Sequence, residues 1–131
     1  MSSPTAILLD TTVVIDVLRS RNQRRSWLVA QVQGRSFLAI SAITLAEIHA
    51  GIRPGEERAT SQLLHALDLF PVTAQIAERA GNLKAALRRT GQTRSIADMI
   101  VAATGLEHHL SVATDNRKDF QIAGLDLFPL P

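Results

Sequence analysis

The sequence contains no cysteine, which excludes disulfide bonds, iron–sulfur clusters, thiolate zinc sites and a cysteine nucleophile. Aromatic residues make up only 4% of the chain, against 46% hydrophobic residues in total, so the predicted core is aliphatic. No apolar run approaches the roughly 18 residues of a membrane-spanning helix, and the N-terminal residues lack a signal-peptide pattern. We therefore expect one soluble, cytoplasmic domain over residues 1–131 that makes no contact with a membrane.

Two kinds of ligand-binding motif are also absent. The chain has neither G-x-G-x-x-G nor G-x-x-x-x-G-K-[ST], so a nucleotide cofactor is not expected. Its four histidines have no zinc-binding spacing such as H-E-x-x-H, and we interpret them as surface or partly buried side chains.

Apolar runs of strand length alternate with amphipathic segments along the whole chain. Strands are predicted at 5–9, 37–40, 69–72 and 110–113, and helices at 12–18, 24–33, 41–50, 56–67, 73–90 and 95–104. Pro71 indicates an edge position for the third strand, and the tail at 125–130 is a candidate for one more edge strand. This alternation predicts an α/β fold, a three-layer α/β/α sandwich around a central parallel sheet.

Polar residues follow the first and the fourth predicted strands directly. Asp10 comes after the run Ile7-Leu8-Leu9, and Thr114-Asp115-Asn116 come after 110–113. In an open parallel sheet, ligands bind beyond the carboxyl ends of the strands. If these two strands are adjacent, Asp10 and the Thr114–Asn116 segment lie at the same edge.

Two further acids occur in strongly apolar helices. Glu47 lies on a helical stripe with Ile43 and Ala50, and Asp98 is set in Ile96-Ala97-Asp98-Met99-Ile100-Val101. An unpaired carboxylate is costly to bury, so each acid requires a compensating partner. Three or four carboxylates at one sheet edge would raise each other's pKa or require a cation. Oxygen ligands suit Mg²⁺ or Mn²⁺, which can activate water for phosphodiester hydrolysis.

A purely structural interpretation also fits each acid taken singly. Ser95-x-x-Asp98 and Thr44-x-x-Glu47 match the helix capping box, and Asp10 fits a helix-initiating residue. Capping alone explains the set less well, because each acid also meets an apolar stripe or a strand end. We expect Asp16 to be a solvated surface acid and Asp119 to cap or pair locally.

The charge balance is basic in character. The formal net charge is +2, yet the isoelectric point is about 9.9 because most basic residues are arginine. With four acids confined to one pocket, the remaining surface would suit a polyanion, although an ordinary mixed surface also fits. Solvated helix faces explain the arginine clusters just as well as contacts to phosphate groups do. The candidate phosphate contacts are Arg19, Arg21, Arg24, Arg25, Arg88, Arg89 and Arg94.

Four motifs, in order, resemble those of PIN-domain proteins. They are Leu9-Asp10-Thr11-Thr12-Val13-Val14-Ile15-Asp16, Ser41-Ala42-Ile43-Thr44-Leu45-Ala46-Glu47-Ile48-His49-Ala50-Gly51-Ile52, Ser95-Ile96-Ala97-Asp98-Met99-Ile100-Val101-Ala102-Ala103-Thr104 and Ala113-Thr114-Asp115-Asn116-Arg117-Lys118-Asp119-Phe120. The size and the motif style are similar to the VapC toxins of bacterial toxin–antitoxin pairs. Each motif alone is weak, whereas the ordered set covers nearly the whole chain.

The resemblance implies a Mg²⁺-dependent endoribonuclease that forms a homodimer and is held inactive by a VapB-like antitoxin, with Mn²⁺ as a possible substitute metal. By position, Asp10, Glu47 and Asp98 are the metal-binding and catalytic acids. The fourth acidic position falls among Asp115, Asn116 and Asp119. Asn116 aligns best there as a catalytic residue, and Asp115 is the candidate for a fourth metal ligand.

Two other functions are compatible with parts of the pattern. One is a non-catalytic RNA-binding domain of the same fold, which the retained acids argue against. The other is a phosphatase with Asp10 as nucleophile, which is disfavoured because Thr12 stands where such enzymes carry a second aspartate.

Overall fold

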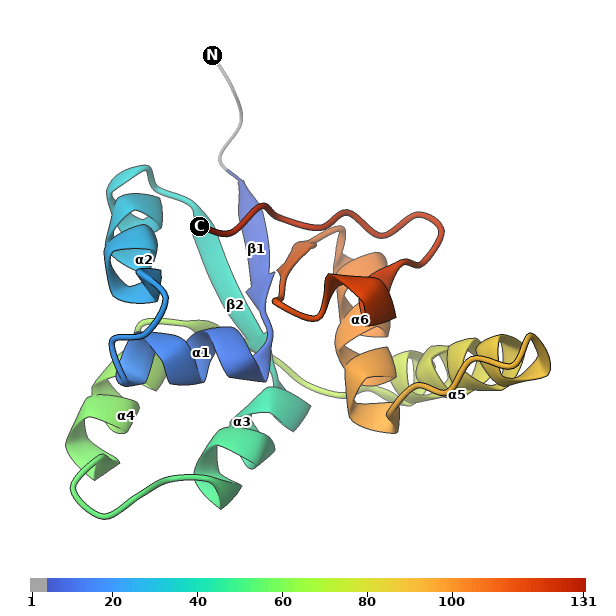
Figure 1. Cartoon of the computed structure of the whole chain (residues 1–131), viewed down its shortest axis with the longest axis horizontal. Helices are drawn as coiled ribbons and strands as arrows, with labels where there is room; N and C mark the ends of the chain where they lie inside the picture. Colours follow the sequence, from blue (N-terminus) through green and yellow to red (C-terminus); the bar gives the residue numbers. More distant parts are fainter. Residues whose placement is uncertain (1–4) are drawn as a thin grey trace.

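The computed structural model describes residues 5–131, so residues 1–4 of the predicted domain lie outside the described part of the chain. A four-stranded sheet runs through the middle of the molecule, with every strand pair parallel (Figure 1). Its strands are β1 (Ala6–Leu9), β2 (Phe37–Ser41), β3 (Asp68–Phe70) and β4 (Ser111–Ala113), in the order β3-β2-β1-β4. The predicted parallel sheet is thus confirmed, with the first and fourth strands adjacent and the third strand at an edge, although β3 ends at Phe70 and Pro71 lies just after it.

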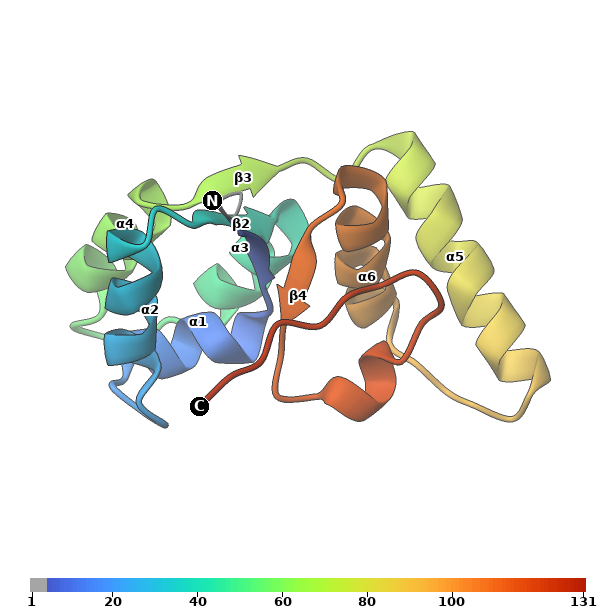
Figure 2. The same ribbon diagram turned by 90° about the horizontal axis from the view of Figure 1, so that it is seen from above.

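Helices connect the strands and cover both faces of the sheet (Figure 2). They are α1 (Thr11–Leu18), α2 (Arg24–Gln33), α3 (Ala42–Ala50), α4 (Glu57–His65), α5 (Ala74–Arg89), α6 (Ile96–His108) and the short 3₁₀ helix η1 (Arg117–Phe120). Within residues 5–131, none of these helices is long and apolar enough to cross a membrane.

Alternate residues of β1 face two separate apolar cores. Ile7 and Leu9 pack with side chains of α1, α2 and α4, whereas Leu8 packs with side chains of α5, α6 and η1. Successive side chains of a strand point to opposite faces, so a strand that is buried on both faces reads as one unbroken apolar run. This arrangement confirms the predicted three-layer α/β/α sandwich.

The C-terminal half differs from the prediction in three places. Helix α6 continues to His108, one turn past the predicted end at Thr104. The tail forms a single parallel bridge, Val112 with Leu127, where a further edge strand was expected. The next residue along, Phe128, donates its N–H to the Val112 carbonyl oxygen (2.8 Å), but Pro129 after it has no N–H with which to extend the pairing. Helix η1 was not predicted.

Candidate active site

Asp10 connects the end of β1 to the start of α1. Its backbone N–H donates to the Ala113 carbonyl of β4 (3.0 Å), so the β1–β4 pairing fixes its position. One carboxylate oxygen, Oδ1, accepts the Thr11 N–H (2.8 Å) as the α1 cap, and Oδ2 accepts the buried Thr114 hydroxyl (2.7 Å). The helix-initiating role is therefore confirmed, and the same side chain stands at the carboxyl edge of the sheet.

The Asp10 carboxyl is buried in an unfavourable setting for a negative charge. Burial raises its pKa above the ordinary value, while the hydrogen bonds from Thr114 and Thr11 act in the opposite direction. The charges of Asp98 and Glu47 raise the pKa further. These two acids therefore lie close enough to Asp10 to act on it electrostatically.

Asp98 lies in the first turn of α6, where Ser95 is the cap residue. The Ser95 hydroxyl accepts the Asp98 N–H (3.0 Å), so the serine half of the predicted capping box is present. The Asp98 carboxyl is half-buried, and burial is the main reason that its pKa is raised, against the effect of the Ser95 hydroxyl. Asp119 and Glu47 raise this pKa further, and Arg94 lowers it.

Glu47 reaches the same edge from the middle of α3, and two predictions about it are wrong. The α3 cap is Ser41, whose hydroxyl accepts the Ile43 N–H (3.2 Å), so Thr44 and Glu47 do not form a capping box. Glu47 is also exposed, because the inward side of α3 runs through Thr44 and Ile48. Its Oε1 accepts the Thr11 hydroxyl (2.6 Å), which joins α3 to the start of α1 beside Asp10.

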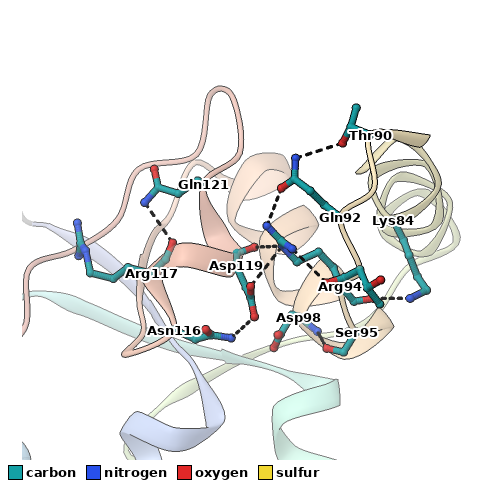
Figure 3. Close-up of polar contacts among 11 residues, drawn as sticks. Lys84, Thr90, Gln92, Arg94, Ser95, Asp98, Asn116, Arg117, Asp119 and Gln121 are labelled. Atoms are coloured by element: carbon teal, nitrogen blue, oxygen red, sulfur yellow. Dashed lines mark hydrogen bonds and ion pairs between the residues drawn. The ribbon is translucent and has the colours of Figure 1, made fainter. Parts of the chain in front are cut away.

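Of the three candidates for the fourth acidic position, Asp115 points away from the other two, which contact each other. The Asp115 carboxylate pairs with the buried guanidinium of Arg24, towards α2 and away from the other acids. Asn116 donates its Nδ2 to Asp119 Oδ2 (2.7 Å), and Asp119 lies close enough to Asp98 to raise its pKa. Figure 3 shows Asp98, Asp119 and Asn116 next to one another. We call Asp10, Glu47, Asp98 and Asp119 the acid cluster.

Arg24 and Asp16 differ most from their predicted surroundings. Asp16 was expected on the surface, yet it is buried, accepts a hydrogen bond from Asn22 Nδ2 (3.0 Å) and pairs with Arg24 Nε (3.7 Å). Arg24 is 3% exposed and is not available to a phosphate group. The sequence gave no signal for this buried pair, because Asp16 belongs to α1 and Arg24 to α2.

The acid cluster has the donor chemistry of a site for a hard divalent cation. Its side chains offer carboxylate oxygens, with the Asn116 amide and threonine hydroxyls nearby, and such oxygens suit Mg²⁺ or Mn²⁺. In the side-chain positions adopted over residues 5–131, no three acidic or histidine groups converge on one point where they could share an ion. The exposed Glu47 and the half-buried Asp98 would therefore have to turn towards Asp10 to do so.

Comparison with known proteins identifies the family. The PIN domain family model matches residues 7–124. Ribonuclease VapC10 of Mycobacterium tuberculosis (strain CDC 1551 / Oshkosh) is 36% identical over 84% of this chain and 82% of its own length. VapC ribonuclease Y4jK of Sinorhizobium fredii is 31% identical over 92% of this chain and 94% of its own.

A solved structure shows the same fold. A chain of a toxin–antitoxin complex from Klebsiella pneumoniae superposes with a TM-score of 0.74 at 29% identity, over 91% of this chain and 94% of that one. The order of the four motifs, the parallel sheet with acids at its carboxyl edge, and these similarities lead to one conclusion: the chain belongs to the PIN-domain family.

Proposed function

We propose that this protein is a divalent-metal-dependent endoribonuclease that acts as the toxin of a VapB–VapC-type toxin–antitoxin pair. Two of its relatives are named VapC ribonucleases, and a similar chain was solved in a toxin–antitoxin complex. The observation that carries the proposal is the acid cluster. Asp10 ends β1, Glu47 comes from α3, Asp98 from α6 and Asp119 from η1, yet the charges of these residues act on one another.

We assign metal binding to Asp10, Glu47 and Asp98, with Asp119 as the fourth acid and Asn116 orienting it. A bound Mg²⁺ or Mn²⁺ would supply an activated water and neutralise charge on the leaving oxygen of a phosphodiester. Asp115 is left out of the assignment, because Arg24 occupies its carboxylate.

Threonine hydroxyls donate to two of these acids. Thr114 donates to Asp10 Oδ2, which is buried, and Thr11 donates to Glu47 Oε1, which is exposed. The Asp10 carboxylate is thereby oriented within the fold, whereas Glu47 has access to solvent and is suited to orient an attacking water. The exposed Lys118 on η1, which precedes Asp119 in the chain, is suited to contact RNA phosphates.

The test is substitution of Asp10 or Asp98 by Asn. Loss of a preorganised charged group of this kind lowers the rate on the order of 100-fold or more, so RNA cleavage with Mg²⁺ or Mn²⁺ and growth arrest on expression should both be lost. The matched control is Asp68→Asn, because Asp68 is an exposed acid at the start of β3. Full cleavage by either site variant would refute the assignment.

A non-catalytic RNA-binding domain of the same fold is the second candidate. It is favoured by the absence of three converging ligand groups in residues 5–131. RNA binding without cleavage, in the presence of either metal, would establish it.

Two further experiments test the proposed partners. Relief of growth arrest by a small protein from the neighbouring gene tests the antitoxin, and light scattering of the purified chain tests the proposed homodimer.

A further inference from the structure

Among the ion pairs of residues 5–131, one involves a member of the acid cluster, and its basic partner is Arg94. It immediately precedes Ser95, the cap of α6, and its side chain is only 10% exposed. Its Nε donates to the main-chain carbonyl of Asp119 (3.2 Å) and lies 3.5 Å from Asp119 Oδ1. Figure 3 shows Arg94 between Gln92 on one side and Asp119 on the other.

The guanidinium is held in place by groups of its own loop. Nη1 donates to the Thr93 carbonyl (3.1 Å), and Nη2 donates to Gln92 Oε1 (2.9 Å). The Arg94 carbonyl in turn accepts a hydrogen bond from Lys84 of α5. The loop between α5 and α6 therefore holds both Nη groups of Arg94 while Nε faces Asp119, a planar arrangement of donors that lysine does not provide.

Asp119 depends on such support because of the element that carries it. Helix η1 is a single 3₁₀ turn of 4 residues, and 3₁₀ hydrogen bonds have poorer geometry than those of an α-helix. Asn116 fixes Oδ2 of Asp119 (2.7 Å), but Asn116 is itself exposed and belongs to the same segment. Arg94 is the contact that ties both the Asp119 main chain and Oδ1 to the start of α6.

Arg94 also lies where two like charges oppose one another. Asp119 acts on Asp98 as a neighbouring negative charge, and Arg94 acts on Asp98 with the opposite sign. The arginine therefore offsets a repulsion that would otherwise drive Asp119 away from Asp98.

We propose that Arg94 is a positioning residue, which holds the Asp119 carboxylate against Asp98 so that Asp119 can take part in binding a divalent cation. This inference rests on the proposed function. It predicts that removal of Arg94 weakens cation binding. An arginine that acted only through its positive charge would have the opposite effect, because its removal would tighten cation binding.

The test measures Mn²⁺ affinity of the full chain without RNA, from the electron paramagnetic resonance signal of the free ion. Loss of a side chain that orients a metal ligand weakens affinity about 10- to 100-fold, so Arg94→Gln should raise the Mn²⁺ dissociation constant about tenfold. Arg94→Lys keeps the charge without the fork and should fall between wild type and Arg94→Gln. The double variant Arg94→Gln with Asp119→Asn should bind no worse than Asp119→Asn alone, because Arg94 acts through Asp119.

The charge-matched control is Arg117→Gln. Arg117 is exposed on η1, and Figure 3 shows its side chain pointing away from Asp119. Its substitution removes the same charge nearby and should leave affinity unchanged or slightly tighter. Far-UV circular dichroism of each metal-free variant establishes that it is folded, and Arg94→Lys decides the question if Arg94→Gln does not fold.

Each outcome separates this inference from the proposed function. If wild type binds Mn²⁺ and Arg94→Gln binds it equally well or more tightly, the positioning role is refuted and the metal site stands. A double variant clearly weaker than Asp119→Asn would also refute it, because Arg94 would then act independently of Asp119. If wild type binds no Mn²⁺, the metal-dependent function fails and the inference fails with it.

Discussion

At the scale of the residue, the candidate site combines structural and chemical roles in the same side chains. Asp10 caps α1 through Oδ1 and receives the Thr114 hydroxyl on Oδ2. Ser95 caps α6 and thereby fixes the backbone that carries Asp98. Capping was predicted as the alternative to a functional role, yet for Asp10 capping is compatible with the proposed metal-binding role, because a helix that starts at a strand end places its cap residue at the sheet's carboxyl edge.

The raised pKa of Asp98 predicts a specific pH dependence of stability in metal-free protein. Unfolding returns this group to a pKa near 3.8, below its folded value, so the folded state holds the proton more tightly and ionisation disfavours folding. As pH rises from about 4 through the raised pKa, wild type should lose unfolding free energy relative to Asp98→Asn. Urea denaturation of both proteins in EDTA between pH 4 and 8 measures the difference.

The difference between the two proteins reports Asp98 together with its effect on Asp10, because the Asp98 charge also raises the pKa of Asp10. Glu56 has a lowered pKa, mainly through its hydrogen bond with Arg19, and contributes stability that is lost as pH falls, but it is present in both proteins. Parallel stability curves over the whole range would show that Asp98 titrates normally.

At the scale of the element, α6 packs very closely on β4 and on the segments that flank it. Gly105 lies at the closest approach, where a Cβ would stand 2.9 Å from Leu125 Cδ1, 3.0 Å from Val112 Cγ2 and 3.2 Å from the Leu110 carbonyl oxygen. The carbonyl belongs to the backbone and cannot rotate away. The glycine is therefore required for packing, although it weakens the helix on its own.

Two glycine-to-alanine substitutions should have opposite effects. Gly105→Ala should lower the free energy of unfolding by about 1–3 kcal/mol, since overpacking outweighs the roughly 1 kcal/mol gain in helix propensity. Gly81→Ala in α5 should raise it by about 0.5–1 kcal/mol, because no atom lies within 4 Å of the new Cβ. Urea denaturation measures both, and a stabilised Gly105→Ala protein would contradict the packing argument.

At the scale of the whole molecule, Arg24 joins segments that are far apart in the sequence. Its guanidinium pairs with Asp16 of α1 and Asp115 after β4, and Nη1 donates to the Pro131 carbonyl oxygen (2.7 Å). The tail thus passes β4 and ends beside α2, as Figure 2 shows. Nε of this buried arginine has no hydrogen-bond partner, so the network lacks one of its possible hydrogen bonds.

Removal of Arg24 should be strongly destabilising. In Arg24→Met the buried carboxylate of Asp16 loses its cation, and breaking a buried ion pair on one side costs about 3–5 kcal/mol. The control is Arg21→Met, an exposed neighbour, which should change stability by less than about 0.5 kcal/mol. Thermal and urea unfolding measure the stability of both variants. Equal stability of the two would disprove the role of the network.

The sequence by itself determined the parallel sheet and its layers, because unbroken apolar runs separated by amphipathic helices have few other ways to be buried. It also identified Asp10, Glu47 and Asp98 as candidate site residues, because a carboxylate beside an apolar strand end or an apolar helix stripe is visible in the local sequence. Only the tertiary structure decided that Asp119 and not Asp115 faces Asp98, that Glu47 is exposed, and that Arg24 and Asp16 are buried. Those outcomes depend on pairings between residues as far as 107 positions apart, and such contacts leave no trace in local periodicity.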